Sequence, residues 1–119
     1  MLDYTGIDSE VQNPQPVTFE LLQNFPNPFN PVTTIPFSIP TWNQRPAVNK
    51  QRMVSLTIYD ARGQRIRALD LDPARSGIHE IVWDGRDANG RDMASGVYFY
   101  RLFLGHGQWS GARKMILMR

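Results

Sequence analysis

Short stretches of the chain alternate between hydrophobic and polar residues, which is the period of a β-strand with one buried face. In residues 32–40 (VTTIPFSIP), Ile35, Phe37 and Ile39 fall on one face. Pro36 falls on the opposite face and has no backbone N–H to donate. The pattern therefore predicts a half-buried edge strand.

A second alternating stretch, residues 54–60 (VSLTIYD), is followed by the turn sequence ARGQ, in which Gly63 can adopt a positive φ. The chain then returns through RIRAL, which carries Ile66 and Leu69. These stretches predict a pair of antiparallel strands. The residues of the first strand that we expect to face inward are Val54, Leu56 and Ile58.

Residues 78–84 (IHEIVWD) have two distinct faces. The face that we expect to point into the core holds His79, Ile81 and Trp83. The opposite face holds Ile78, Glu80 and Val82. We therefore expect Trp83 to be a core residue and His79 to be a buried, hydrogen-bonded histidine rather than a catalytic one.

Two further strands are predicted at residues 96–104 (GVYFYRLFL) and 112–118 (ARKMILM), the first of them rich in aromatic and β-branched residues. The dipeptide Asn89-Gly90 is typical of a tight hairpin turn. No stretch has a helical period, and short strands recur roughly every 10 residues with glycine-rich turns between them. This organisation favours an all-β, antiparallel β-sandwich.

The stiffest stretch is residues 24–31 (NFPNPFNP), which we call the proline ribbon. Its three prolines exclude a helix or a central strand and favour extended backbone at the residues that precede them. We expect Phe25 and Phe29 to pack inward along a sheet edge. The prolines offer no donors to a neighbouring strand, so the ribbon would also protect that edge from aggregation.

Residues 1–19 have no hydrophobic period, two prolines and an acidic bias, and are predicted to be a linker. The opening Met1-Leu2-Asp3 suggests a piece cut from a longer protein. Residues 41–53 are polar and aperiodic and predict a long loop with an exposed Trp42. The remainder is long enough for one domain with a real core.

Charge is unevenly distributed along the chain. Residues 1–20 carry four acidic and no basic residues, a local charge of −4, whereas the chain from Arg45 onward carries 13 basic and 7 acidic residues, a local charge of +6. A basic body can attract nucleic acid or an anionic surface. However, arginine and aspartate are interspersed, as in DGRDANGRD, so we expect solvated turns and no nucleic-acid partner.

The composition excludes several kinds of chemistry. The chain has no cysteine, which excludes disulfides, thiolate metal sites and cysteine catalysis. No apolar run approaches the roughly 18 residues of a membrane-spanning helix, and the start does not resemble a signal peptide. Neither of the two histidines, His79 and His106, lies near a nucleophile elbow. We expect neither enzymatic activity nor a cofactor.

A calcium site and a sugar platform are the two ligand sites that the residue types suggest. The oxygen-bearing residues of one loop are Asp84, Asp87, Asn89 and Asp92. Placing Gly90 sixth in an EF-hand loop puts glycines where carboxylates are required, so tight turns explain these residues better. The tryptophans that offer flat apolar area for a sugar are Trp42, Trp83 and Trp109.

Four blocks of sequence follow one another in a characteristic order: LLQNFPNPFNPVTTIPFSIP, VSLTIYDARGQRIRAL, SGIHEIVWDGRDANGRDMASGVYFYRL and ARKMILMR. Together they resemble the C-terminal sorting domains of type IX secretion cargo, the type A family, from about Leu21 to Arg119. The later blocks are also similar to the Ig-like domain of flagellar hook-capping proteins. The resemblance implies an Ig-like antiparallel β-sandwich of about seven strands over residues 20–119, with residues 1–19 as the linker from an upstream cargo.

The resemblance also implies that the secretion machinery recognises three segments of the chain. The matching residues are Pro26, Asn27, Pro28 and Phe29 in the ribbon, Gly96, Val97 and Tyr98 in the penultimate strand, and Arg113, Lys114, Met115, Ile116 and Leu117 at the end. The loop 41–53 is longer than the usual turn of the family. A role for Trp42 is therefore not inherited.

The function implied by the resemblance is that of a non-catalytic sorting signal, which directs a larger cargo through the periplasm and across the outer membrane to the cell surface or medium. The implied partners are the outer-membrane translocon, a shuttle protein, a surface signal peptidase and the covalently attached cargo, with the domain as a monomer. The alternative is an accessory binding module of an extracellular enzyme, for carbohydrate or for another domain. We expect the last strand to be recognised by a partner, so that deletion of residues 113–119 impairs delivery more than folding.

Overall fold

The computed structural model of the chain describes residues 20–39, 54–71, 77–105 and 107–119. This part of the chain consists of strands, turns and irregular segments and contains no helix, so it holds no helix that could cross a membrane. The predicted linker, the loop with Trp42 and the histidine at position 106 lie outside the described residues.

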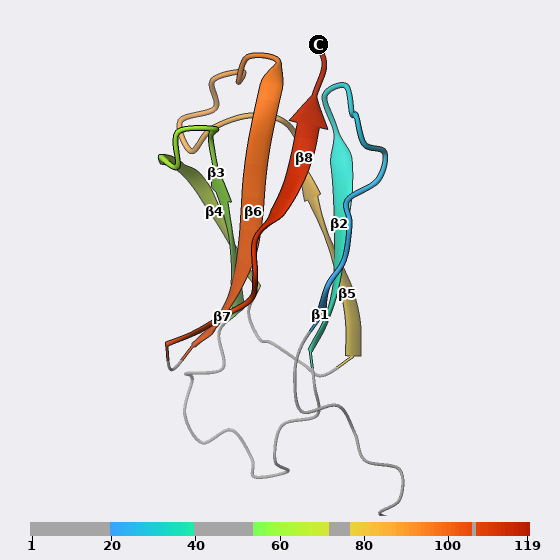
Figure 1. Ribbon diagram of the computed structural model, residues 1–119, viewed down its shortest axis with the longest axis vertical. Coiled ribbons are helices and arrows are strands. Elements are labelled where there is room, and N and C mark those ends of the chain that lie inside the picture. The colour runs from blue at the N-terminus through green and yellow to red at the C-terminus, as the bar shows by residue number, and fades with distance from the viewer. Residues whose placement is uncertain (1–19, 40–53, 72–76, 106) are drawn as a thin grey trace, which may run out of the picture.

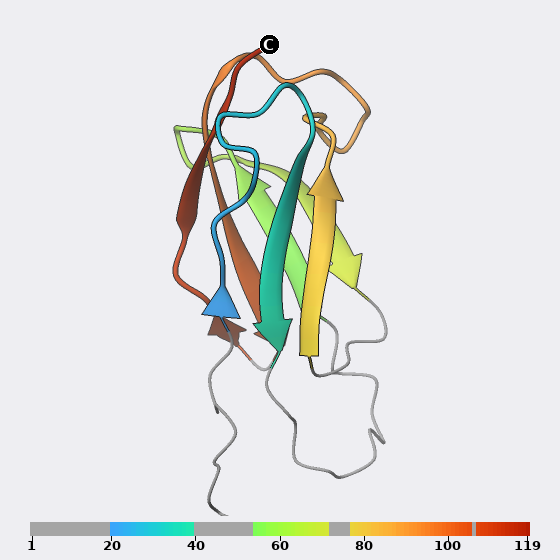
Figure 2. The ribbon, with the colours of Figure 1, turned by 90° about the vertical axis from the view of Figure 1, so that its right-hand side faces the viewer.

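Two antiparallel sheets lie face to face (Figures 1 and 2). The described strands are β1 (Glu20–Leu21), β2 (Thr33–Ile39), β3 (Val54–Tyr59), β4 (Arg65–Leu71), β5 (Gly77–Trp83), β6 (Gly96–Gly105), β7 (Gln108–Trp109) and β8 (Arg113–Leu117). One sheet has the order β1-β2-β5, and the other has the order β4-β3-β6-β7 with β8 also paired to β6. The predicted Ig-like antiparallel sandwich is confirmed, with β1 and β7 as additional strands of only two residues.

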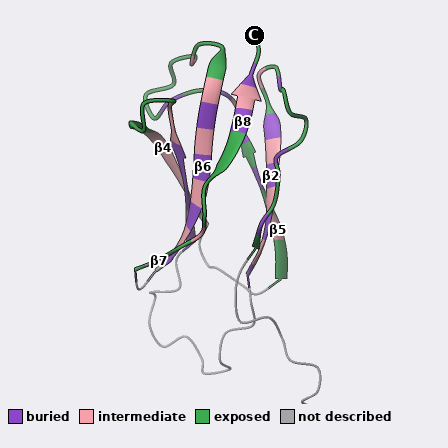
Figure 3. Cartoon of the chain, viewed as in Figure 1, coloured by how far each residue is buried: buried purple, intermediate pink, exposed green. Residues whose placement is uncertain are grey.

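Buried residues recur along the strands of both sheets (Figure 3), and the buried hydrophobic ones form a single core cluster. In β2 every second residue from Thr33 to Ile39 is buried, as the period predicts. The buried residues of β3 include the three that were expected to face inward, Val54, Leu56 and Ile58. Each such side chain contributes roughly 1.5–3 kcal/mol by leaving water, so the facing strands are held together chiefly by this core.

A bulge in β4 explains why Ile66 and Leu69 both pack against the core, although residues three positions apart in a regular strand point to opposite faces. The pairing of β3 with β4 shifts register between Ile58 and Tyr59, which oppose Arg67 and Arg65. Ile66 is therefore an extra residue, and the side chains of both Ile66 and Leu69 contact the core cluster.

The prediction that Pro36 marks an edge strand is wrong, because β2 lies between β1 and β5. Thr34 exchanges both of its backbone hydrogen bonds with Phe25, at 2.9 Å each, and Pro36 accepts one from the N–H of Leu22 at 3.0 Å. These two residues of β2 thus face the ribbon side. Pro36 has no backbone N–H, so one hydrogen-bond donor is absent on this irregular side of β2. The pairing of β2 with β5, on the other side, is regular throughout.

The two faces of β5 are as predicted. Ile81 and Trp83 are buried, whereas Ile78 and Val82 are exposed on the opposite face. His79 is half-buried rather than fully buried, and its ring stacks on Phe37 with a centroid separation of 5.6 Å.

The predicted turns are also present. Gly63 and Gly90 have φ values of 86° and 83°, which only glycine adopts without strain. Around Asn89 the turn is closed by hydrogen bonds from the N–H of Gly90 to the carbonyl of Asp87 and from the N–H of Asp87 to the carbonyl of Arg91.

Candidate recognition surface

The proline ribbon connects the edges of the two sheets (Figures 1 and 2). At its start, Phe25 pairs with Thr34 of β2. Near its end, the N–H of Phe29 donates to the carbonyl of Ile116 at 2.9 Å, and the N–H of Met118 donates to the carbonyl of Phe29 at 2.8 Å. We call the contact of Asn27 and Phe29 with β8 the seam. The ribbon therefore closes one side of the sandwich.

The two phenylalanines of the ribbon have different environments. Phe29 is 2% exposed, whereas Phe25 is 53% exposed, so the expectation that both pack inward is wrong for Phe25. The physical reason is that Phe25 forms an isolated bridge to β2, while Phe29 reaches over the core and packs on Trp83 at a centroid distance of 5.7 Å.

A buried polar network fixes the beginning of the ribbon. The side-chain amide of Asn24 donates to Thr33 Oγ1 at 2.9 Å and to the carbonyl of Pro26 at 3.2 Å, and Thr33 Oγ1 donates to that same carbonyl at 2.9 Å. The hydroxyl of Tyr100 accepts from the N–H of Asn24 at 2.9 Å and donates to the carbonyl of Leu22 at 2.6 Å. Burial raises the pKa of Tyr100, which keeps this hydroxyl protonated.

Side-chain amides replace part of a strand ladder along β8. Asn27 Oδ1 accepts from the N–H of Ile116 at 2.9 Å, and Gln23 Nε2 donates to the carbonyl of Lys114 at 2.9 Å. In a regular sheet, backbone groups of a neighbouring strand would make both bonds. Sequence reasoning did not identify Gln23 or Asn24. The clue available in the sequence is that these two amide side chains stand at the start of the proline ribbon, whose prolines cannot donate backbone hydrogen bonds to a neighbouring strand.

The structure brings together all three segments that the resemblance assigned to recognition. β8 lies between the ribbon and β6, and its pairing with β6 places Val97 opposite Ile116 and Tyr98 opposite Met115. Of the matching residues, four are buried: Phe29, Tyr98, Met115 and Leu117. Those exposed or half-buried are Pro26, Asn27, Pro28, Gly96, Val97, Arg113, Lys114 and Ile116. Only this second group can contact a partner of the folded domain directly.

The buried residues of this set stabilise the surface by packing in the core beneath it. Trp83 is fully buried and contacts Phe29 and, edge to face at 5.5 Å, Tyr98. Its indole N–H donates to the carbonyl of Arg86 at 2.9 Å. The hydroxyl of Tyr98 donates to the carbonyl of Ala94 at 2.7 Å, and burial raises the pKa of Tyr98.

The pairing of β8 corrects one expectation from the sequence. Met115 and Leu117 are fully buried, and β8 is paired with β6 on one side and with the ribbon on the other. Removing two such side chains costs about 2–5 kcal/mol each, which is comparable with the whole stability of a small domain. We therefore expect deletion of residues 113–119 to impair folding as well as delivery.

The acidic loop uses its carboxylates within the fold. Asp84 pairs with Arg67 at 2.9 Å, and Asp92 pairs with Arg86 at 3.1 Å. Asp87 accepts from the backbone N–H groups of Arg91 and Asn89, and these hydrogen bonds, with the charge of Arg91, hold its pKa below the usual value despite partial burial. Within the described ranges, no cluster of three or more potential metal ligands is present.

Two of the three tryptophans are described, and neither offers a free stacking face. Trp83 is buried in the core. Trp109 is 41% exposed, but the guanidinium of Arg101 lies 4.0 Å from its ring centroid, and Phe103 packs against it at 4.6 Å. This arrangement does not favour the sugar platform.

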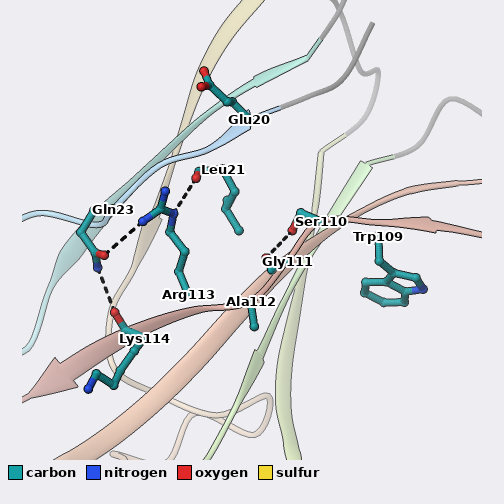
Figure 4. Close-up of a pocket in the computed structure, with 9 residues that line it drawn as sticks. All are labelled: Glu20, Leu21, Gln23, Trp109, Ser110, Gly111, Ala112, Arg113 and Lys114. Carbon is teal, nitrogen blue, oxygen red and sulfur yellow. Dashed lines mark hydrogen bonds between the residues drawn. The ribbon is translucent and has the colours of Figure 1, made fainter.

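A groove of about 590 Å³ lies beside the seam, between β1 and the segment that leads into β8 (Figure 4). One wall is formed by Glu20, Leu21 and Gln23. The other is formed by Trp109, Ser110, Gly111, Ala112, Arg113 and Lys114. We call it the β1–β8 groove. Arg113 crosses it, donating from Nε to the carbonyl of Leu21 at 2.6 Å.

Comparison with known proteins defines the class of the domain. A family model described as the FlgD Ig-like domain matches residues 47–102. The basal-body rod modification proteins FlgD of Salmonella typhimurium and Salmonella typhi are each 33% identical over 66 residues, which is 56% of this chain and 26% of theirs. This protein therefore contains an Ig-like domain similar to that of FlgD and spans about a quarter of the length of these relatives.

Solved structures extend the similarity beyond the FlgD-like region. Latent dimeric PorU from Porphyromonas gingivalis has a TM-score of 0.64 and 25% identity, over 97% of this chain and 10% of that one. PorZ, described as an essential surface component of the type IX secretion system of the same organism, has a TM-score of 0.50 and 23% identity, over 82% of this chain and 11% of that one. FlgD from P. aeruginosa has a TM-score of 0.54 and 20% identity, over 71% and 60% of the two chains.

Proposed function

We propose that the domain is a non-catalytic sorting signal of type IX secretion. The observation that carries the proposal is that the ribbon, at the start of the described chain, meets β8 and β6, near its end, in one continuous surface. These are the segments that resemble the motifs of the type A family. Eight of the matching residues are exposed or half-buried there, so a partner of the folded domain can contact them directly.

The comparison with PorU supports the proposal. It covers nearly the whole chain at 25% identity and so extends past residues 47–102, the part that matches the FlgD family model. Two of the three elements of the proposed recognition surface, the ribbon and β8, lie outside that part, whereas the residues of β6 at positions 96–98 lie within it. The similarity in fold to PorZ is consistent with the same secretion route.

In the proposed mechanism, the folded surface is recognised rather than a free terminal peptide. Exposed groups of the surface, including Lys114, Pro28 and Asn27, meet the shuttle protein or the translocon, while the buried residues hold them in place. The upstream cargo follows because it is covalently attached, and the surface signal peptidase then separates the two. The destination is the cell surface or the medium.

The proposal is tested with a fluorescent reporter that carries an export signal and is fused to the 119-residue chain in a bacterium with type IX secretion. One fusion carries Ile116→Glu and Lys114→Glu, which place negative charge on β8. A matched control carries Val82→Glu and Arg62→Glu, which make the same change in charge at exposed positions elsewhere. Thermal unfolding of each purified protein establishes that it is folded.

We expect the unmodified fusion and the control to reach the surface or the medium, and the β8 variant to accumulate in the periplasm as a folded protein. Periplasmic retention of the unmodified fusion would refute the sorting function. Equal export of the two variants would refute recognition through β8 while leaving the sorting function in place.

A further inference from the structure

The edge of β8 is incompletely paired where it enters the β1–β8 groove. The backbone groups of Lys114, Ile116 and Met118 point toward the ribbon side, because alternate residues of a strand bond to opposite neighbours. Those of Ile116 are bonded to the ribbon, and so is the N–H of Met118. The carbonyl of Lys114 is bonded only to the side chain of Gln23, and its N–H has no bond to any described residue on this side. The groove thus exposes a strand edge.

The charges beside this edge favour an acidic occupant. The ammonium group of Lys114 has no carboxylate within 4.0 Å among the described residues. Arg113 uses Nε for the carbonyl of Leu21, and its Nη1 lies 3.5 Å from Gln23 Oε1, which leaves further donors of the guanidinium available. Glu20 lines the opposite wall, away from Lys114 (Figure 4). The end of the groove at β8 is therefore positively charged.

The size and lining of the groove fit a short stretch of extended chain. A volume of about 590 Å³ lies within the range of ligand sites in proteins. Gln23 and Arg113 bridge it through side chains, which can change rotamer without disturbing the sheets. Ala112 and the exposed part of Trp109 supply a small apolar surface beside the edge of β8.

We propose that the β1–β8 groove binds an extended, acidic peptide segment of a protein partner by strand addition to β8. The bound segment would accept a hydrogen bond from the N–H of Lys114 and displace Gln23 from the carbonyl of the same residue. Carboxylates on one face of the segment would pair with the Lys114 ammonium group, whereas the side chain of Arg113, the preceding residue of the strand, points to the opposite face. This inference goes beyond the sorting function and stands whether or not the domain directs secretion.

The test uses the purified 119-residue chain and two synthetic probes, a short capped peptide of alternating valine and glutamate and the corresponding peptide of valine and lysine. Binding is followed by two-dimensional amide NMR, in which the N–H of Lys114 reports directly on the groove. Two variants are titrated in parallel, Lys114→Glu and the matched control Arg62→Glu, which makes the same change in charge on an exposed turn. Their amide spectra also establish that both are folded.

We expect the glutamate peptide to produce saturable shifts at Lys114 and its neighbours and to protect that amide from hydrogen exchange. The lysine peptide should not, and Lys114→Glu should weaken the glutamate peptide about tenfold or more, since like charges would then meet. Arg62→Glu should leave the affinity nearly unchanged, because salt screens the interaction between the peptide and a charge far from the groove. No shift at Lys114, equal binding of both peptides, or shifts confined to β5 would each overturn the proposal.

Discussion

The side-chain oxygen of Asn27 accepts a hydrogen bond from the backbone N–H of Ile116 at 2.9 Å, across 89 positions of the sequence. The same N–H would otherwise face the ribbon without an acceptor. A single amide thus joins the proline ribbon to the last described strand, so the seam depends on the identity of residue 27 and not only on the prolines beside it.

Replacing Asn27 with alanine should therefore weaken the seam. We expect Asn27→Ala to lower the free energy of unfolding by about 0.5–1.5 kcal/mol, the usual net value of one hydrogen bond. Urea denaturation measures the change, and Asn30→Ala provides the control, because Asn30 is an exposed ribbon residue without a hydrogen bond to the described chain. Equal losses in the two variants would contradict the assignment.

The Tyr100 hydroxyl should be worth more than an exposed hydrogen bond. Tyr100→Phe removes the partner of both the Asn24 N–H and the Leu22 carbonyl, and we expect a loss of about 1–3 kcal/mol. Tyr59→Phe is the control, since its hydroxyl accepts one bond from Arg101 at the outer face of the sheet. If Tyr100→Phe unfolds at the same urea concentration as the unmodified domain, the network does not stabilise the ribbon.

Alkaline pH should destabilise the domain through the buried tyrosines. Burial raises the pKa of Tyr98 and of Tyr100 above the usual value of about 10. The folded state therefore favours the protonated form, so this contribution to stability is complete below pH 10 and is lost as pH rises through the folded-state pKa. We expect thermal midpoints to fall in this range, and the fall to be smaller in Tyr100→Phe.

Asp87 should make the opposite contribution at acid pH. Because backbone hydrogen bonds from its own turn lower its pKa, it stabilises the folded state above the unfolded pKa of about 3.9, and this stability is lost as pH falls through the lower folded-state pKa. Asp87→Asn should have a lower free energy of unfolding than the unmodified protein at neutral pH. On acidification its free energy of unfolding should fall less. Asp70→Asn, at an exposed position of β4, should follow the unmodified protein. Parallel acid titration curves for Asp87→Asn and the unmodified protein would argue against this role.

Trp83 should be indispensable to the core. It is fully buried between Phe29 and Tyr98, so Trp83→Ala should cost about 3–5 kcal/mol and leave the domain largely unfolded in circular dichroism. Trp109→Ala removes an aromatic ring of the same size from the surface and should leave the domain folded. Retention of the native spectrum in Trp83→Ala would show that the core does not require this residue.

The elements with a clear period could be predicted from the sequence, and those without one could not. Alternation located β2, β3 and β5 and gave the buried face of each, because period-two burial is a local property. β1 has two residues and carries no period. The bulge at Ile66 adds one residue to β4 and so changes which face the neighbouring residues occupy. No residue type marks the bulge, so the spacing of hydrophobic residues does not reveal it.

The residues of the candidate surface were predicted from the resemblance, but the contacts among them were not. The resemblance named Asn27, Phe29 and the β8 residues, yet the pairing among them spans nearly the whole described chain. The local pattern of the ribbon did not reveal that Phe25 and Phe29 differ in burial, because neither belongs to a stretch with a strand period. Their different exposure is decided by which sheet each one meets.

The position of β8 between the ribbon and β6 also sets the order in which this molecule can mature. Ribosomes make the ribbon early and β8 last among the described strands, so Phe29 has no strand partner, and the core lacks Met115 and Leu117, until synthesis has passed residue 117. A product that stops before Arg113 is therefore unable to assemble the surface at all. The folded surface is therefore a mark of a chain that has been translated through β8.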